Sequence, residues 1–262
     1  MATYVVSDLH GQYRIFKQGL KDIDLKDDDF LYVIGDVIDR GNDGIKILEY
    51  IRRHKNMDLL LGNHEHMMLN SVDPFGGEEC RGIDTDLWIY LNGGLQTYEK
   101  YLDLTPKSRK RLFSWLNNRY VVKTIEVNGK NFCLTHSFYT EKCVNKRCSE
   151  LEYDDAWDIV WKSMFREDRS TRADNIYKDL PYTFITGHVP VHKARRDYGA
   201  EEDFNRLETF TVGNMIDIDG GCAYLCRFGM ECGALFLRLD DMKVFPVRMI
   251  RDDIPIMDEM MF

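Results

Sequence analysis

Five short apolar runs in this sequence end in the same way, each in a side chain that can bind a metal ion. The runs are YVVSD, YVIGD, LLLGN, FCLTH and FITGH, and their last residues are Asp8, Asp36, Asn63, His136 and His188. A buried carboxylate without a partner is costly, so a core strand that leads into one needs a compensating charge. Because ligands gather beyond the carboxyl ends of the strands in a parallel-rich sheet, we expect these five ends to meet in one crevice.

The first third of the chain alternates strand and helix patterns. Residues 3–6, 30–34 and 57–61 are short apolar runs typical of buried strands, whereas 12–23 and 44–54 carry apolar residues at helical spacing. The alternation repeats about every 28 residues, which fits successive βαβ units. The sequence therefore predicts an α/β protein with a mostly parallel sheet.

The remainder of the chain is less regular. Residues 78–120 predict a helical insert that covers one end of the sheet. The segments VVKTIEV and KNFCLTH predict a hairpin that turns at Asn128-Gly129, a strong turn signal. We expect a helix at 152–165, a polar loop at 190–208, and three antiparallel strands at TFTVGNMIDID, GALFLRL and KVFPVRM. No repeat or flexible linker interrupts the chain, which favours one domain over residues 1–262.

Composition narrows the classes of function. The 262 residues are 44% hydrophobic, enough for one sizeable core, and the net charge of −9 disfavours a nucleic-acid binder. No apolar run approaches the length of a membrane span, and the N-terminus lacks a signal-peptide pattern. Seven scattered cysteines without a C-x-x-C pair favour reduced thiols over a structural zinc site. We therefore expect a cytoplasmic protein without membrane contact, and the sequence is silent on its oligomeric state.

The donor set suits a particular kind of metal site. Carboxylate, amide oxygen and imidazole favour manganese, iron, zinc or nickel over thiolate-preferring ions. With His10 added, the candidate ligands are too many for one ion that keeps an open position, and they suit two ions bridged by a carboxylate. Two metal ions held about 3.5–4 Å apart bind the attacking and leaving oxygens in phosphoryl transfer.

Three ordered motifs carry a family resemblance. SDLHG at 7–11, GDVIDRG at 35–41 and GNHE at 62–65 resemble the signature blocks of the metallophosphoesterases, and more narrowly of the phosphoprotein-phosphatase branch. Trp88 followed by NGGLQT at 92–97 is similar to the bacterial and phage members, which include symmetrical diadenosine tetraphosphate hydrolases. The resemblance implies an α/β fold, a two-sheet β-sandwich flanked by helices in four αββα layers.

The resemblance also implies two divalent ions, with Mn2+ as the first choice, and the residues that would hold them. The first ion would be held by Asp8, His10 and Asp36. The second would be held by Asp36, Asn63, His136 and His188, with Asp36 as the bridge.

The catalytic roles come from the same resemblance. His64 would be the general acid that protonates the leaving oxygen, Asp39 would orient it, and Arg40 would bind phosphate oxygens. A metal-bridging hydroxide would attack phosphorus in line. The family's second phosphate-binding arginine is missing from its usual place after a tryptophan, so Lys162 or Arg166 would have to replace it.

These residues predict a dinuclear metal-dependent phosphatase that hydrolyses phosphate monoesters, of the serine/threonine protein phosphatase type. The alternative is a dinucleotide polyphosphate hydrolase that acts on diadenosine tetraphosphate. A non-catalytic metal-binding regulator is a third possibility, which the pairing of Asp39 with His64 disfavours. The expected partner is a phosphorylated protein or a small phosphate ester.

Several further residues are weaker candidates for a role in the site. Glu65 could orient its neighbours or cap the helix that follows, and His66 could lie behind the site or on the surface. Asp217 and Asp219 occupy alternate positions of a predicted strand, and each could form a salt bridge near the following turn. The predicted loop contains four basic groups that could bind phosphates beyond the scissile one, or could simply be solvated. They are His192, Lys193, Arg195 and Arg196, balanced by an acidic run at 201–203.

Overall fold

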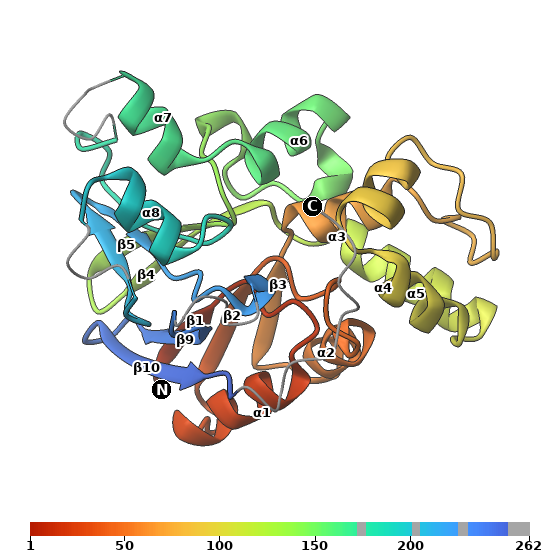
Figure 1. Cartoon of the computed structure of the whole chain (residues 1–262), viewed down its shortest axis with the longest axis horizontal. Helices are drawn as coiled ribbons and strands as arrows, with labels where there is room; N and C mark the ends of the chain where they lie inside the picture. Colours follow the sequence, from red (N-terminus) through yellow and green to blue (C-terminus); the bar gives the residue numbers. More distant parts are fainter. Residues whose placement is uncertain (172–176, 201–204, 225–229, 251–262) are drawn as a thin grey trace.

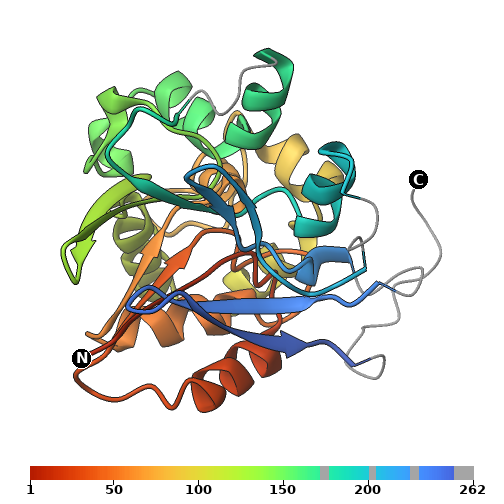
Figure 2. The same cartoon turned by 90° about the vertical axis from the view of Figure 1, so that its left-hand side faces the viewer.

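Two five-stranded sheets form the centre of the part of the chain that the structure describes (Figures 1 and 2). The structure is a computed structural model and describes residues 1–171, 177–200, 205–224 and 230–250. The first sheet has the order β10-β9-β1-β2-β3, with β1 at Thr3–Val6, β2 at Phe30–Ile34, β3 at Met57–Leu60, β9 at Gly233–Arg238 and β10 at Lys243–Arg248. The second has the order β4-β5-β6-β8-β7, with β4 at Val122–Val127, β5 at Lys130–Thr135, β6 at Thr183–Thr186, β7 at Phe210–Val212 and β8 at Met215–Asp217.

Three neighbouring strands in each sheet run parallel. In the first sheet, β1 pairs with β2 and β2 pairs with β3. In the second sheet, β5 pairs with β6 and β6 pairs with β8. Since parallel strands end at the same edge, each sheet presents three carboxyl ends side by side. The fold class expected from the sequence, two sheets flanked by helices, is confirmed.

Alternate residues of the central strands face two hydrophobic clusters. Val5 of β1 and Ile34 of β2 share a buried cluster with Leu134 of β5 and Ile185 of β6, which places this cluster between the sheets. Their neighbours in sequence, such as Val6 and Val33, belong to the cluster on the opposite face. This period of two is what a strand buried on both faces requires.

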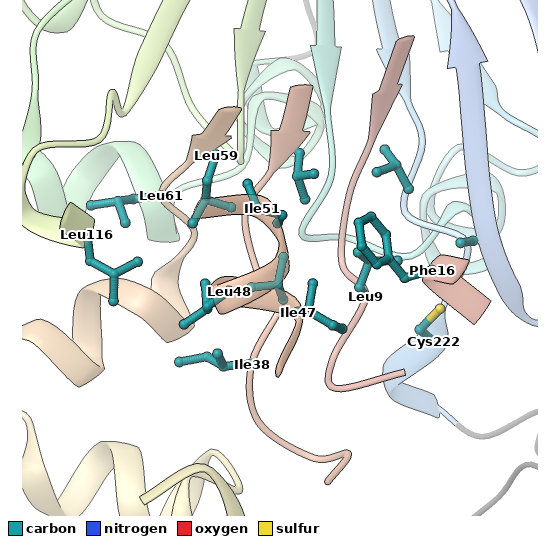
Figure 3. Close-up of a cluster of buried hydrophobic side chains, with 14 of the residues drawn as sticks. Leu9, Phe16, Ile38, Ile47, Leu48, Ile51, Leu59, Leu61, Leu116 and Cys222 are labelled. Atoms are coloured by element: carbon teal, nitrogen blue, oxygen red, sulfur yellow. The ribbon is translucent and has the colours of Figure 1, made fainter. Parts of the chain in front are cut away.

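Helices α1 (Tyr13–Asp22) and α2 (Gly44–Arg53) cover the outer face of the first sheet (Figures 1 and 3). Figure 3 shows Ile47, Leu48 and Ile51 of α2 lying beside Leu59 of β3. Gly19 lets α1 approach β9 closely, because a Cβ there would lie 2.0 Å from the ring of Phe236. Helical spacing of apolar residues therefore predicts this layer correctly.

Further helices lie beyond the carboxyl edge of the first sheet and over the second (Figures 1 and 2). They are α3 at Asn63–Leu69, the π-helix η1 at Leu87–Leu91, α4 at Leu95–Leu102, α5 at Pro106–Asn117, α6 at Tyr153–Trp161, α7 at Met164–Thr171 and α8 at Val191–Asp197. The hairpin of β4 and β5 turns at Asn128-Gly129 as predicted, and both residues have positive φ, 52° and 75°. Within the described ranges, no helix is long and apolar enough to cross a membrane.

Three local predictions are wrong. The helix expected at 152–165 is two helices, because Lys162 is extended with ψ of 151° and breaks it after Trp161. The expected loop at 190–208 contains α8. The segment TFTVGNMIDID is a hairpin of β7 and β8 that turns at Gly213, with φ of 58°, and β8 pairs in parallel with β6.

Candidate active site

The predicted ligands lie just beyond the strand ends, as expected. Asp8 and Asp36 follow β1 and β2 by two residues, and His136 directly follows β5. The backbone turns sharply there, with φ of 50° at Asp8, 52° at Asp36 and 70° at His188. Such left-handed conformations in residues other than glycine cost roughly 1–3 kcal/mol each and cluster at functional sites.

Asp36 is the centre of the arrangement. Its Oδ2 lies 3.4 Å from Nε2 of His136 and 3.8 Å from Nε2 of both His10 and His64. Asn63 extends the cluster, because its Oδ1 lies 3.1 Å from Nε2 of His136 and 3.0 Å from Nδ1 of His188. These side chains are buried, apart from His188, which lines a cavity together with Asp36 and Asn63.

Two three-residue groups in the described chain could each hold a metal ion. One is His10, Asp36 and His64, and the other is Asp36, His136 and His188, with ligand atoms within 4.8 Å of one another in each. Asp36 belongs to both groups, as a bridging carboxylate would. The first group contains His64 where the resemblance implies Asp8.

Backbone contacts fix which imidazole nitrogen faces the centre. Nδ1 of His10 donates to the carbonyl of Ile38 at 3.1 Å, and Nδ1 of His136 donates to the carbonyl of Ile34 at 3.0 Å. Both rings therefore direct Nε2 toward Asp36. Metal-binding histidines are held in this way in known sites.

Glu65 holds the loop that carries Asp36. Its buried carboxylate accepts the backbone N–H groups of Asp36 at 2.8 Å, Val37 at 2.9 Å and Gly62 at 3.1 Å. Gly62 has no space for a side chain, since a Cβ would lie 2.1 Å from Oδ1 of Asp36. Both roles considered for Glu65 from the sequence, orienting neighbours and capping α3, are present.

His64 is oriented by a buried polar chain. Its Nδ1 donates to Oδ2 of Asp39 at 2.6 Å, and the indole N–H of Trp88 donates to the same oxygen at 2.8 Å. The backbone N–H of Asp39 donates to Oγ1 of Thr97 at 2.9 Å. The sequence indicated the Asp39–His64 pair but missed the parts played by Trp88 and Thr97, which come from η1 and α4.

A cavity of about 210 Å³ opens over these residues. Besides the histidines, two arginines and one lysine line it: Arg40, Arg166 and Lys193. Lys162, the other candidate for the missing arginine, instead pairs with Asp158 at 2.6 Å on an exposed part of α6. The helix break after Trp161 thus brings Arg166 of α7, and not Lys162, to the cavity.

The basic cluster expected near residue 192 is dispersed, and only Lys193 lines the cavity. Arg195 is buried and donates to the carbonyl oxygens of Arg206 and Glu208, both at 2.6 Å. His192 donates to the carbonyl of Glu231 at 2.7 Å. Arg196 is exposed beside Asp197, and the acidic run at 201–203 lies outside the described residues.

His66 does not belong to the site. It is buried against Tyr153 and Trp157, with ring centroids 5.4 Å and 6.2 Å apart. Burial lowers the pKa of His66 to about 4, so the ring is neutral. It therefore packs α3 against α6.

The electrostatics of the cluster match a cation site. Burial raises the pKa of Asp8 to about 7, against the opposing effect of His136. Burial lowers the pKa of His188 to about 3, and the neighbouring His136 lowers it further. For His136, burial acts to lower the pKa, but Asp36 and Asp8 raise it to about 10. Because carboxylates and imidazoles are buried side by side, divalent ions that bind both fit this donor set.

The fold and this donor set define a metallophosphoesterase. The sequence model of the calcineurin-like phosphoesterase family matches residues 1–218. The chain therefore belongs to the calcineurin-like phosphoesterase family.

Two curated relatives differ in their named activity. A symmetrical bis(5'-nucleosyl)-tetraphosphatase of Buchnera aphidicola is 31% identical over 130 residues, which is 48% of this chain and 41% of that protein. The chain thus spans less than half the length of this relative. Serine/threonine-protein phosphatase 2 of Salmonella typhimurium is 26% identical over 222 residues, 83% of this chain and 86% of that protein.

Solved structures support the fold alone. A candidate diadenosine tetraphosphatase superposes with a TM-score of 0.55 at 15% identity, covering 94% of this chain and 92% of that one. A metallophosphoesterase from Sphaerobacter thermophilus gives a TM-score of 0.51 at 15% identity, covering 95% and 88%.

Proposed function

We propose that this protein is a metal-dependent phosphatase that hydrolyses phosphate monoesters, of the serine/threonine protein phosphatase type. The observation that carries the proposal is the position of His64, whose Nδ1 is held by Asp39 while its Nε2 faces Asp36. A protein that only binds metal has no need of such an oriented acid. The family and the broad coverage of the Salmonella phosphatase agree with it.

Two divalent ions, with Mn2+ as our first choice, would be held by this chain's own strand ends. Asp8, His10 and Asp36 would hold one ion, and Asp36, Asn63, His136 and His188 the other. When bound, such ions supply Lewis-acid polarisation of the phosphoryl group and a nucleophile at neutral pH.

The side chains of the cavity would do the rest. Arg40 and Arg166 would bind the phosphate oxygens, for which a planar guanidinium is suited. Asp39 would keep the proton on Nδ1 of His64, so that Nε2 can carry the proton delivered to the leaving oxygen. The cavity is smaller than the 300–1,000 Å³ or so of typical small-molecule pockets, which suits a phosphate whose leaving group stays largely outside.

Chelation followed by a substrate panel tests this function. We expect exhaustive chelation to abolish hydrolysis and Mn2+ to restore it, because the proposed ions would polarise the phosphoryl group and supply the nucleophile. The panel contains a phosphoserine peptide, a chromogenic monoester and diadenosine tetraphosphate. Full activity in metal-free buffer after chelation would refute the metal-dependent mechanism.

The second candidate, a dinucleotide polyphosphate hydrolase, is favoured by Lys193. This side chain lines the cavity, and it takes part in none of the ion pairs of the described residues. Burial and the nearby Arg166 lower the pKa of Lys193, and the charge of Asp197 only partly opposes them. A phosphate beyond the scissile one would supply that charge.

We expect Lys193→Ala to raise KM for diadenosine tetraphosphate about 10-fold, as for a lost charged hydrogen bond, and to leave a small monoester unaffected. Arg196→Ala, on the exposed side of α8, is the matched control and should change neither. Unchanged kinetics on both substrates in Lys193→Ala would remove this lysine from the site. A wild-type enzyme far faster on the dinucleotide than on any phosphopeptide would reverse our ranking.

A further inference from the structure

The second sheet has one more strand end at the site than the sequence indicated. Strands β5, β6 and β8 are parallel neighbours, and His136 and His188 follow the first two. Thr186 of β6 is level with Asp217 of β8, and the N–H of Ile218 donates to the carbonyl of Thr186 at 2.9 Å. His188 lies two residues after the end of β6, and Asp219 lies two residues after the end of β8. Asp219 is therefore placed as the known candidates are.

The side chain of Asp219 is fixed and reaches the cavity. It is 3% exposed, and it lines the cavity together with His10, Asp36 and His188. Its Oδ1 accepts the N–H of Gly221 at 2.8 Å, which sets the side-chain direction. Within the described residues, no hydrogen bond or ion pair is made by its Oδ2. Asp219 thus lines the cavity with one carboxylate oxygen that has no protein partner among the described residues.

We propose that Asp219 is a further carboxylate of the metal centre, contributing Oδ2 to the surroundings of the ion nearest Asp8, either directly or through a water molecule. This inference rests on the proposed metal-dependent function. Three strand ends of each sheet would then contribute: those followed by Asp8, Asp36 and Asn63 in the first sheet, and those followed by His136, His188 and Asp219 in the second.

The charges around Asp219 support this role. Burial raises its pKa well above the usual range, and the negative charges of Asp8 and Asp36 raise it further, whereas His136 opposes them. Three buried carboxylates that repel one another need cations more than two do. A bound divalent ion would offset that repulsion.

A purely structural role makes a different prediction. If Asp219 only shapes the turn to Gly221, Asn would replace it without loss, because an amide oxygen accepts the same N–H. Asp217 offers a matched control. It is also a buried carboxylate of this segment, and its Oδ1 accepts the N–H of Asp219 at 2.9 Å, but it does not line the cavity.

The test is calorimetric titration of Mn2+ alone, without any ester, into metal-free wild type, Asp219→Asn and Asp217→Asn. We expect Asp219→Asn to weaken one of two binding events about 10- to 100-fold, the usual effect of losing a group that supports a metal site, and Asp217→Asn to bind as wild type does. Thermal unfolding without metal should show Asp219→Asn melting no lower than wild type, with a smaller gain when Mn2+ is added.

The outcomes separate this inference from the proposed function. Two wild-type affinities in folded Asp219→Asn would overturn the inference, even if the enzyme is an active phosphatase. Weakened Mn2+ binding in Asp219→Asn would support it, even if wild type hydrolyses no monoester on the panel. Equal weakening in Asp217→Asn and Asp219→Asn would also overturn it, by assigning the effect to the segment as a whole.

Discussion

Replacing Asp36 with Asn is expected to lower kcat/KM by about 10³-fold or more and to reduce the bound metal below two ions per chain. The reason is that Asp36 belongs to both candidate metal groups, and a neutral amide cannot offset two divalent charges. Asn keeps an oxygen that can accept the N–H of His64, which donates to Oδ1 of Asp36 at 3.1 Å. The backbone should therefore persist while the bridge is lost. Metal content by mass spectrometry, measured with the kinetics, checks both parts.

The control for Asp36→Asn is Asp24→Asn. Asp24 also has a positive φ, 48°, but it is an exposed residue after α1 that pairs with Lys26. This variant makes the same chemical change at a similar backbone conformation and should alter neither metal content nor rate. Two tightly bound ions and normal turnover in Asp36→Asn would contradict the bridging role.

The second large effect is expected for His64→Asn, with a fall in kcat of about 10²–10⁴-fold, the usual range for a lost general acid. Metal content should stay near two ions, because His64 is proposed as the proton donor and not as a ligand. The fall should be smaller for substrates with a good leaving group, which need little protonation. Comparing an alkyl phosphate with a nitrophenyl phosphate measures this dependence.

The structure makes the experiment on His64 decisive, because Nε2 of His64 also belongs to one of the two three-residue groups. Loss of metal in His64→Asn would show that it is a ligand and that the acid lies elsewhere. His54→Asn, at the end of α2 and away from the cavity, is a suitable control and should have wild-type kinetics.

The predictable part of this site follows from local sequence. Short apolar runs that stop at a ligand-type side chain pointed to Asp8, Asp36 and His136, because both the run and the residue that ends it are local features of the sequence. The turn at Asn128-Gly129 was predictable for the same reason, since positive φ at both positions favours these two residues.

What the sequence missed depends on contacts between distant segments. The alternation in MIDID is compatible with an antiparallel strand, and only the parallel pairing of β8 with β6 places Asp219 beside His188. The burial of Arg195 depends on carbonyl oxygens at least 11 residues away. Likewise, the choice of Arg166 over Lys162 depends on the break after Trp161, which no propensity at Lys162 signals.

The left-handed backbone at the strand ends sets stability and activity against each other. Asp8, His10, Asp36 and His188 have φ between 40° and 70°, and glycine in such positions would release strain at no steric cost. Several such positions together store an amount of free energy comparable to the 5–15 kcal/mol or so by which domains are stable. Substitutions that stabilise the protein would therefore be found readily at these strained positions, where they would remove residues of the active site. Selection for catalysis must act continually against such substitutions.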